Sequence, residues 1–357
     1  MWSNIPIIDL SVFGTDDSEA NTYRHNGERI LELEQHKAMV AKQLHEALSE
    51  IGFVYIKNHG CPEAIIQNAF ESMNQFFELP HDHKKNLDAK KSPLYRGYND
   101  IETGAHSCTP EDKSYNKPDF KESFTIGAED FKAGESSSPM HGPNVWPGED
   151  LCPGFEKTMM AYWFQLKDKV AVRLMRALAM SLDLDDIDFF CSKCDNPVAQ
   201  MVLLRYPPNP IEKECDSCSK LSKRRGCGAH TDCGFLTILA QDETAGLEVK
   251  RSYDDTWISA PPIPGTFVVN LGDMAARWTN DHYRSTEHRV TNTSTTMSRH
   301  SIPFFINCNF DTVVECLATN AILKTSDSDE FEPRYPPVQA GEYILQKLGL
   351  MHMINSK

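Results

Sequence analysis

The sequence is poor in positive charge relative to negative charge. Among its 357 residues, 36 are lysine or arginine and 51 are aspartate or glutamate, which gives a formal net charge of −15. An acidic chain of this kind repels the phosphates of nucleic acids and of anionic membranes, so we expect neither as a partner. A local basic site for a small anionic molecule is compatible with this overall charge.

Long apolar runs are also missing. No stretch of 18 consecutive apolar residues occurs, which predicts that no helix crosses a membrane. The first residues, MWSNIPIIDLSVFG, lack the basic region and apolar core of a secretory signal, so we expect a cytoplasmic protein. Internal repeats and low-complexity tracts are absent too. The composition, 40% apolar, is that of a globular chain of one or two domains.

Cysteine, by contrast, is abundant. The eleven cysteines are odd in number and, without a secretory signal, favour free thiols over a disulfide framework. Cys191 and Cys194 precede Cys215 and Cys218 by a 20-residue gap, the spacing of a structural zinc site. Between the pairs, QMVLLRYPP predicts a core strand of roughly 25 Å at ~3.3 Å per residue, which would hold the pairs apart. Scattered thiols are therefore favoured, with a zinc-stabilised binding protein as the alternative.

The apolar periodicity divides the chain into three regions. Residues 1–185 combine short strand signals at 5–10 and 52–60 with helical patterns at 31–50, 62–80 and 153–183. Residues 91–150, within this region, are rich in Pro, Gly and Ser and predict mostly loop. Residues 311–357 form a C-terminal segment with a helix predicted at 336–350.

The region 198–310 has a different pattern, because short strands separated by turn signals follow one another. We expect these strands at about 200–206, 235–240, 246–250, 256–260, 266–271, 283–290 and 299–307. Such a succession is typical of an antiparallel sandwich or barrel with helices packed outside it.

The segment GAHTDCGFLTIL at 228–239 contains a candidate metal site. On a strand, His230 and Asp232 point to the same face, and a buried pair of this kind needs a partner such as a metal ion. His288, in the strand-like YRSTEHRVTN, completes the two-histidine, one-carboxylate set that binds non-haem Fe(II) and leaves coordination positions open. His282 is the alternative third ligand, but it lies in the turn-like TNDHY.

A candidate anion site follows in SRHSIPFF. Arg299 and Ser301 share a strand face, and arginine grips a carboxylate with two parallel hydrogen bonds. Tyr206, in LLRYPP, can add a hydroxyl from a neighbouring strand. The sequence therefore predicts a metal with open positions beside a carboxylate clamp.

With these motifs the chain resembles the Fe(II)- and 2-oxoglutarate-dependent oxygenases of the isopenicillin N synthase-like group. The resemblance covers nearly the whole chain: IPIIDL, GFVYIKNHG and YRGY match the N-terminal region, and KPDFKESFTIG with HGPNVWP match the middle. RYPP, HTDCGFLTIL, GLEV, VVNLGD, HRV and RHS follow in the family's order. Each piece is weak alone, but the ordered set is specific.

The resemblance implies a mainly β fold with α-helices: a double-stranded β-helix (jelly-roll) core flanked by N-terminal helices and a C-terminal helix. It implies that His230, Asp232 and His288 hold Fe(II), and that Arg299, Ser301 and Tyr206 bind 2-oxoglutarate as co-substrate. O2 is the oxidant, with ascorbate as an accessory reductant, and the protein is expected to act as a monomer on a small molecule. Arg96, Tyr98, Phe304 and Asn309 are candidates for lining the substrate pocket, with a framework role as the alternative.

The reaction outcome is left open by the resemblance. Oxidation of an unactivated C–H bond can end in hydroxylation, desaturation or oxidative cyclisation, the last as in kainoid synthases. Isopenicillin N synthase itself uses the same triad without 2-oxoglutarate, and LLRYPP resembles its version of that segment. Ethylene-forming enzymes, which fragment 2-oxoglutarate, share the KPDF, HGP and RxPP pieces.

Overall fold

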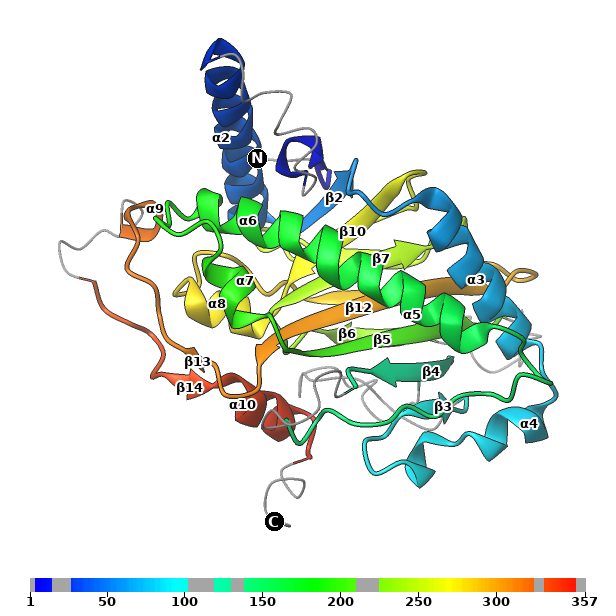
Figure 1. Cartoon of the computed structure of the whole chain (residues 1–357). Coiled ribbons are helices and arrows are strands. Elements are labelled where there is room, and N and C mark those ends of the chain that lie inside the picture. The colour runs from blue at the N-terminus through cyan, green and yellow to red at the C-terminus, as the bar shows by residue number, and fades with distance from the viewer. Residues whose placement is uncertain are drawn as a thin grey trace, which may run out of the picture.

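Two β-sheets form the centre of the molecule. The computed structural model describes residues 4–14, 27–101, 119–129, 138–209, 225–323 and 331–350. Within them, the larger sheet has eight strands (Figure 1), in the order β1 (Ile7–Asp9), β2 (Phe53–Lys57), β10 (Thr266–Leu271), β7 (Leu236–Gln241), β12 (Arg299–Asn309), β5 (Pro197–Tyr206), β4 (Glu122–Gly127) and β3 (Gly97–Asn99). The smaller sheet has the order β6 (Cys227–His230), β11 (His288–Val290), β8 (Leu247–Lys250) and β9 (Trp257–Ser259).

From β5 to β12 the chain alternates between the sheets. β5, β7, β10 and β12 belong to the larger sheet, while β6, β8 with β9, and β11 belong to the smaller one. Neighbouring strands of this core are antiparallel throughout. This is the double-stranded β-helix expected from the sequence, and the expectation is confirmed.

The larger sheet has two buried faces of different character. One face packs against helices, in a layer that includes Met201, Leu203 and Phe304. The other faces the smaller sheet, and apolar side chains from both sheets meet there, among them Phe53, Tyr206, Val249 and Val290. Because successive side chains of a strand point to opposite faces, residues with odd and even numbers in one strand enter different layers.

Helices cover one face of the larger sheet (Figure 1). The longest are α2 (Gly27–Glu50), α3 (Glu63–Phe77), α5 (Phe155–Gln165) and α6 (Ala171–Ser181), the last two joined by a π-helical turn, η3 (Leu166–Val170). The pattern at 153–183 predicted one regular helix, and the π turn is a departure from it. Shorter helices are η1 (Ser11–Phe13), α4 (His81–Asn86), η2 (Ala89–Lys91), α7 (Phe189–Lys193), α8 (Asp273–Trp278), α9 (Asn320–Leu323) and α10 (Ala340–Lys347). A two-stranded ladder, β13 (Val313–Val314) with β14 (Val338–Gln339), precedes α10.

Several elements differ from the sequence expectation, among them β3, which lies in the segment predicted as mostly loop, and β6, which was not among the expected strands. β4 lies in the segment predicted as mostly loop, and it joins the sheet beside β5. α8 was not predicted. β11 begins at His288 instead of 283, because the residues before it form a turn in which Ser285 bonds Asp273 and Thr286 bonds the Ile51 carbonyl oxygen.

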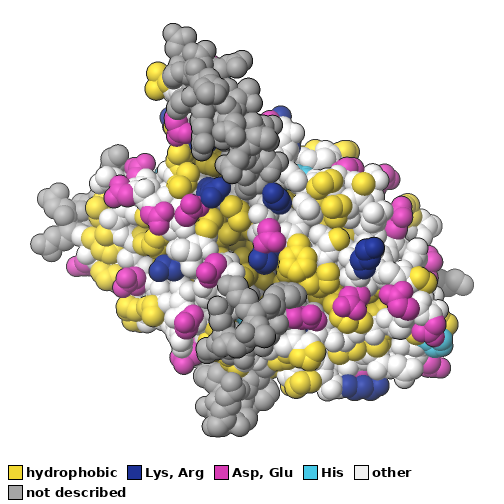
Figure 2. All heavy atoms as spheres, viewed as in Figure 1, with side chains coloured by type: hydrophobic (Ala, Val, Ile, Leu, Met, Phe, Trp, Pro, Cys, Tyr) yellow, Lys and Arg dark blue, Asp and Glu magenta, His cyan; other side chains and the backbone are white. Residues whose placement is uncertain are grey.

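The surface agrees with the composition. In the view of Figure 2, lysine and arginine side chains are scattered among acidic ones and form no continuous basic field. In the part of the chain that the structure describes, no helix combines the length and apolar character needed to cross a membrane.

Candidate metal centre and anion site

His230, Asp232 and His288 converge between the two sheets. β6 and β11 pair so that His230 and His288 lie directly opposite each other, with ring centroids 4.3 Å apart. Asp232 follows β6, and its Oδ1 lies 3.8 Å from His230 Nε2 and 3.7 Å from His288 Nε2. The three ligand atoms are all within 4.8 Å of one another, and they form the only such cluster of three or more among the described residues.

Backbone carbonyl groups orient both imidazoles. His230 Nδ1 lies 2.7 Å from the Gly228 carbonyl oxygen, and His288 Nδ1 lies 3.0 Å from the Thr286 carbonyl oxygen. A carbonyl oxygen only accepts, so each Nδ1 carries a proton and the neutral ring presents its Nε2 lone pair to the centre. Metal-binding histidines are commonly oriented in this way, by donating from the ring nitrogen that does not bind the metal.

The carboxylate of Asp232 is held from the other sheet. Its Oδ2 accepts hydrogen bonds from Thr237 Oγ1 at 2.6 Å and from Asn270 Nδ2 at 2.7 Å. Thr237 lies on β7 and Asn270 on β10, so the larger sheet fixes one oxygen and leaves Oδ1 for a ligand. Both residues are polar positions within apolar strands, and this is the feature of the sequence that marks them.

Electrostatics couple the three groups. Burial raises the pKa of Asp232, but the two imidazoles and its two hydrogen bonds outweigh burial and lower that pKa below its usual range. Burial, helped by His230, lowers the pKa of His288 to about 4. Burial also opposes a charge on His230, but the Cys227 sulfur and Asp232 raise its pKa to about 9. The site therefore favours an anionic carboxylate, the form that a metal ion requires, whereas His230 has to release its Nε2 proton when a metal binds.

Arg299 lies fully buried on the inter-sheet side of β12. Its Nη1 donates to Ser301 Oγ at 3.0 Å and its Nη2 to Gln241 Oε1 at 2.7 Å, and the guanidinium stacks 5.2 Å from the Tyr206 ring centroid. No carboxylate among the described residues forms an ion pair with it, and burial lowers its pKa. The Asp242 carboxylate attracts this cation without forming an ion pair with it. A buried cation whose hydrogen-bond partners are neutral is costly, so an anionic ligand fits here. Gln241 was not predicted from the sequence.

The four expected pocket residues do not face the triad. Phe304 lies on the opposite face of β12 from Arg299, with its ring 4.8 Å from that of Trp163 on α5, because residues 299 and 304 differ in parity. Tyr98 donates to Glu122 Oε2 at 2.7 Å on the same helix side.

Arg96 and Asn309 also have structural partners. Arg96 donates to the carbonyl oxygens of Gly142, Ala128 and Met140. Asn309 bonds Asp195 and the Asn196 amide. These contacts correct the expectation for all four residues.

Other sequence candidates are accounted for as follows. His282 Nε2 lies 3.1 Å from His45 Nε2, away from the triad. Cys194 neighbours Cys308, and Cys215 and Cys218 lie outside the described residues.

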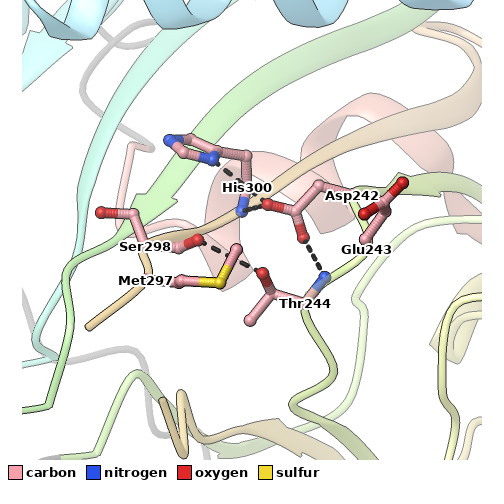
Figure 3. Close-up of a pocket in the computed structure, with 6 residues that line it drawn as sticks. All are labelled: Asp242, Glu243, Thr244, Met297, Ser298 and His300. Atoms are coloured by element: carbon pink, nitrogen blue, oxygen red, sulfur yellow. Dashed lines mark hydrogen bonds and ion pairs between the residues drawn. The ribbon is translucent and has the colours of Figure 1, made fainter. Parts of the chain in front are cut away.

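A surface hollow (Figure 3) is lined by Asp242, Glu243, Thr244, Met297, Ser298 and His300. In it, the carboxylate of Asp242 accepts hydrogen bonds from the His300 and Thr244 amides. None of the triad lines it.

A double-stranded β-helix with a His-x-Asp…His centre defines a class, the non-haem iron oxygenases. Two family models match the chain: the N-terminal region of non-haem dioxygenases in morphine synthesis over residues 5–149, and the 2OG-Fe(II) oxygenase superfamily over residues 198–307. The chain belongs to the 2OG-Fe(II) oxygenase superfamily. It is an enzyme that depends on Fe(II) and 2-oxoglutarate.

Similar proteins agree with this assignment. A homoarginine-6-hydroxylase of Glycine max is 33% identical, over 89% of this chain and 90% of its own. A 2-oxoglutarate-Fe(II) type oxidoreductase of Aspergillus fumigatus is 34% identical, over 96% of this chain and 91% of its own. The crystal structure of a full-length Neurospora crassa protein in complex with alpha-KG and thymine has a TM-score of 0.74 at 29% identity, covering 97% of this chain and 96% of that one.

Proposed function

We propose that His230, Asp232 and His288 hold the Fe(II), and that Arg299 binds the far carboxylate of 2-oxoglutarate with help from Ser301 and Tyr206. The observation that carries the proposal is the pairing of two incomplete sites on the same side of the larger sheet. One is a set of three lone pairs aimed at one point, and the other is a buried guanidinium without a carboxylate.

The spacing of these sites along β12 supports a diacid between them. Ser301 pairs with Gln241 beside the clamp, while Phe305 pairs with Thr237, the residue that anchors Asp232. Four residues of strand separate the two levels, on the order of 13 Å at ~3.3 Å per residue. A five-carbon dicarboxylate spans a gap of this order when its side-chain partners reach toward it from each end.

The protein's own groups have distinct roles in this proposal. Fe(II) and 2-oxoglutarate bound there would supply O2 activation, with succinate and CO2 as co-products. Thr237 and Asn270 keep Asp232 ionised and oriented. The Phe53 ring, 5.2 Å from the His288 ring, and the apolar inter-sheet layer exclude bulk water from the reacting atoms.

The primary substrate is proposed to lie against the part of the inter-sheet face that is not fully covered. Thr125, Gln200 and Phe305 share this side of the larger sheet by strand parity and register, and each is partly exposed. A hydroxyl, an amide and an aromatic ring suit a small polar molecule. Homoarginine, in the name of the Glycine max relative, and thymine, bound to the Neurospora crassa protein, are also small polar molecules.

We propose hydroxylation as the outcome. The test is a panel of basic amino acids and pyrimidines incubated with the Fe(II)-loaded enzyme, 2-oxoglutarate and O2, scored by succinate release and by a product with one added oxygen atom. Substrate-dependent succinate with that product is expected. Full turnover without 2-oxoglutarate would point to isopenicillin N synthase-like chemistry, and ethylene release to fragmentation, and either result overturns the proposal.

A further inference from the structure

The strand that carries His230 is held at its outer edge by residues far away in the sequence. β6 is an edge strand of the smaller sheet and has four residues. Residues 119–121, just before β4, run beside residues 225–228, and we call this contact the seam. In it, the Phe120 amide donates to the Arg225 carbonyl oxygen at 2.8 Å, and Lys121 Nζ lies 3.2 Å from Cys227 Sγ.

Asp119 is the centre of the seam. Its side chain is almost completely buried, and Oδ1 accepts a hydrogen bond from the Gly228 amide at 3.1 Å. Arg225 Nε lies 3.3 Å from Oδ1, and Lys121 Nζ lies 3.3 Å from Oδ2. The carbonyl oxygen of Gly228 accepts the proton of His230 Nδ1. Gly228 therefore links the two side chains: its N–H is bound by Asp119, and its carbonyl oxygen is bound by the imidazole of His230.

The other histidine is held by the same kind of connection. His288 donates to the carbonyl oxygen of Thr286, two residues before it, as His230 does to that of Gly228. Thr286 is held in place by its own side chain, whose hydroxyl donates to the Ile51 carbonyl oxygen at 2.6 Å. Gly228 has no side chain and a permissive backbone, so an outside group has to fix it.

We propose that Asp119 is a positioning residue for the metal centre: by holding Gly228 it sets the direction in which His230 presents Nε2. The inference rests on the proposed role of His230 as an iron ligand. Loss of the direct hydrogen-bond partner of a metal-binding histidine typically weakens metal affinity about 10- to 100-fold. Asp119 acts through that partner, Gly228, so the Asp119→Ala variant is expected to lose about 10-fold, the lower end of this range.

The experiment measures metal binding rather than turnover. Metal-free wild type, Asp119→Ala and Asp119→Asn are titrated anaerobically with Fe(II), and the visible spectrum of the Co(II)-loaded proteins reports the coordination geometry. The amide oxygen of Asp119→Asn can still accept from Gly228, so this variant should keep most of the affinity, whereas Asp119→Ala should show weaker binding and an altered Co(II) spectrum.

The control is Glu129→Ala. Glu129 lies beyond the other end of β4 and also accepts a backbone hydrogen bond, from the Asn144 amide at 3.0 Å, but no triad residue is connected to it. Its loss should lower stability without changing metal affinity. Thr286→Val removes the equivalent connection at His288 and should weaken Fe(II) binding as Asp119→Ala does, which keeps the test available where Asp119→Ala does not fold.

Three results overturn the inference. They are unchanged Fe(II) affinity in folded Asp119→Ala or in Thr286→Val, an Asp119→Asn variant as weak as Asp119→Ala, and an equal loss in Glu129→Ala. Failure of the proposed iron ligation looks different, because His230→Ala then binds Fe(II) as tightly as wild type.

Discussion

Each triad side chain is held by a hydrogen bond that turns its free lone pair toward the other two. His230 and His288 use a carbonyl oxygen two residues earlier in the chain, and Asp232 uses Thr237 and Asn270. The ligand atoms are therefore in position before any metal arrives. Pre-arrangement of this kind lowers the cost of binding, since little side-chain freedom is lost.

Alanine at any triad position should abolish iron-dependent turnover. His230→Ala, Asp232→Ala and His288→Ala each remove a ligand atom, whereas His282→Ala should largely keep activity, because His282 contacts His45 and Ser49 instead of the triad. Succinate release by the reconstituted variants measures this. An active His288→Ala beside an inactive, iron-free His282→Ala would reverse the ligand assignment.

Arg299→Lys should weaken 2-oxoglutarate binding, because a point charge replaces a two-pronged guanidinium. Losing a charge-assisted hydrogen bond costs roughly 1.5–3 kcal/mol, which raises the KM for 2-oxoglutarate about 10- to 150-fold. The KM for the primary substrate should change much less.

Arg205→Lys is the matched control for this change. Arg205 lies on the neighbouring strand, where it bonds Glu122 and the Phe77 carbonyl oxygen on the helix side. A similar rise in the 2-oxoglutarate KM in both variants would show that the effect of Arg299→Lys is not local to the clamp.

His45 and His282 connect the C-terminal part of α2 to the turn between α8 and β11. His45 Nδ1 lies 2.9 Å from the Ser181 carbonyl oxygen, so it carries a proton and leaves Nε2 as an acceptor for His282 Nε2. Ser49 and Tyr283 complete the cluster. Because His282 Nε2 supplies the proton of this bond, acid can add a proton to His282 only at Nδ1, and burial, His45 and Arg284 all oppose the resulting charge.

The stability of the protein should therefore fall in mild acid. Burial, together with His45 and Arg284, lowers the pKa of His282 to about 4 from its usual 6.5. The folded state prefers neutral His282, so its contribution is complete above pH 6.5 and is lost as the pH falls toward 4. The contribution is at most about 3 kcal/mol.

Urea unfolding of wild type and His282→Gln between about pH 7.5 and 5 tests this prediction. Glutamine can still donate to His45 but does not titrate in this range, so the variant should lose less stability than wild type as the pH falls. Parallel curves would contradict the prediction, and the difference between the two proteins excludes contributions from the other histidines.

Eleven cysteines in one chain raise the question of a second metal for the molecule as a whole. Eight of them lie in the described residues and form no disulfide there, and Cys191 and Cys194 join no cluster of three or more metal-binding groups in that part of the chain. Cys194 lies beside Cys308 instead. These observations favour one metal centre and unpaired thiols.

Changing Cys215 and Cys218 together to serine should cost little stability, and the wild type should hold no tightly bound zinc. Elemental analysis and thermal unfolding measure both quantities. Loss of a structural zinc or disulfide removes several kcal/mol, so a destabilisation of that size, with stoichiometric zinc in wild type only, would establish the zinc-scaffold alternative.

Local backbone geometry accounts for what could be predicted from the sequence alone. Alternation along a strand places His230 near the face of Asp232 and Arg299 on the face of Ser301, and turn signals delimit most of the core strands. The order of the motifs pointed to the family, and from the family came the double-stranded β-helix. None of these steps needed a long-range contact.

Only the tertiary structure decided which layer each strand face meets. Alternation shows that Phe304 and Arg299 lie on opposite faces, but the packing of α5 against β12 determines that Phe304 enters the helix-side layer. The partners of Asp232, the clamp residue Gln241 and the bond from Asp119 to Gly228 likewise join residues distant in sequence. Such contacts arise when the sheets close on each other, and local patterns carry no information about that closure.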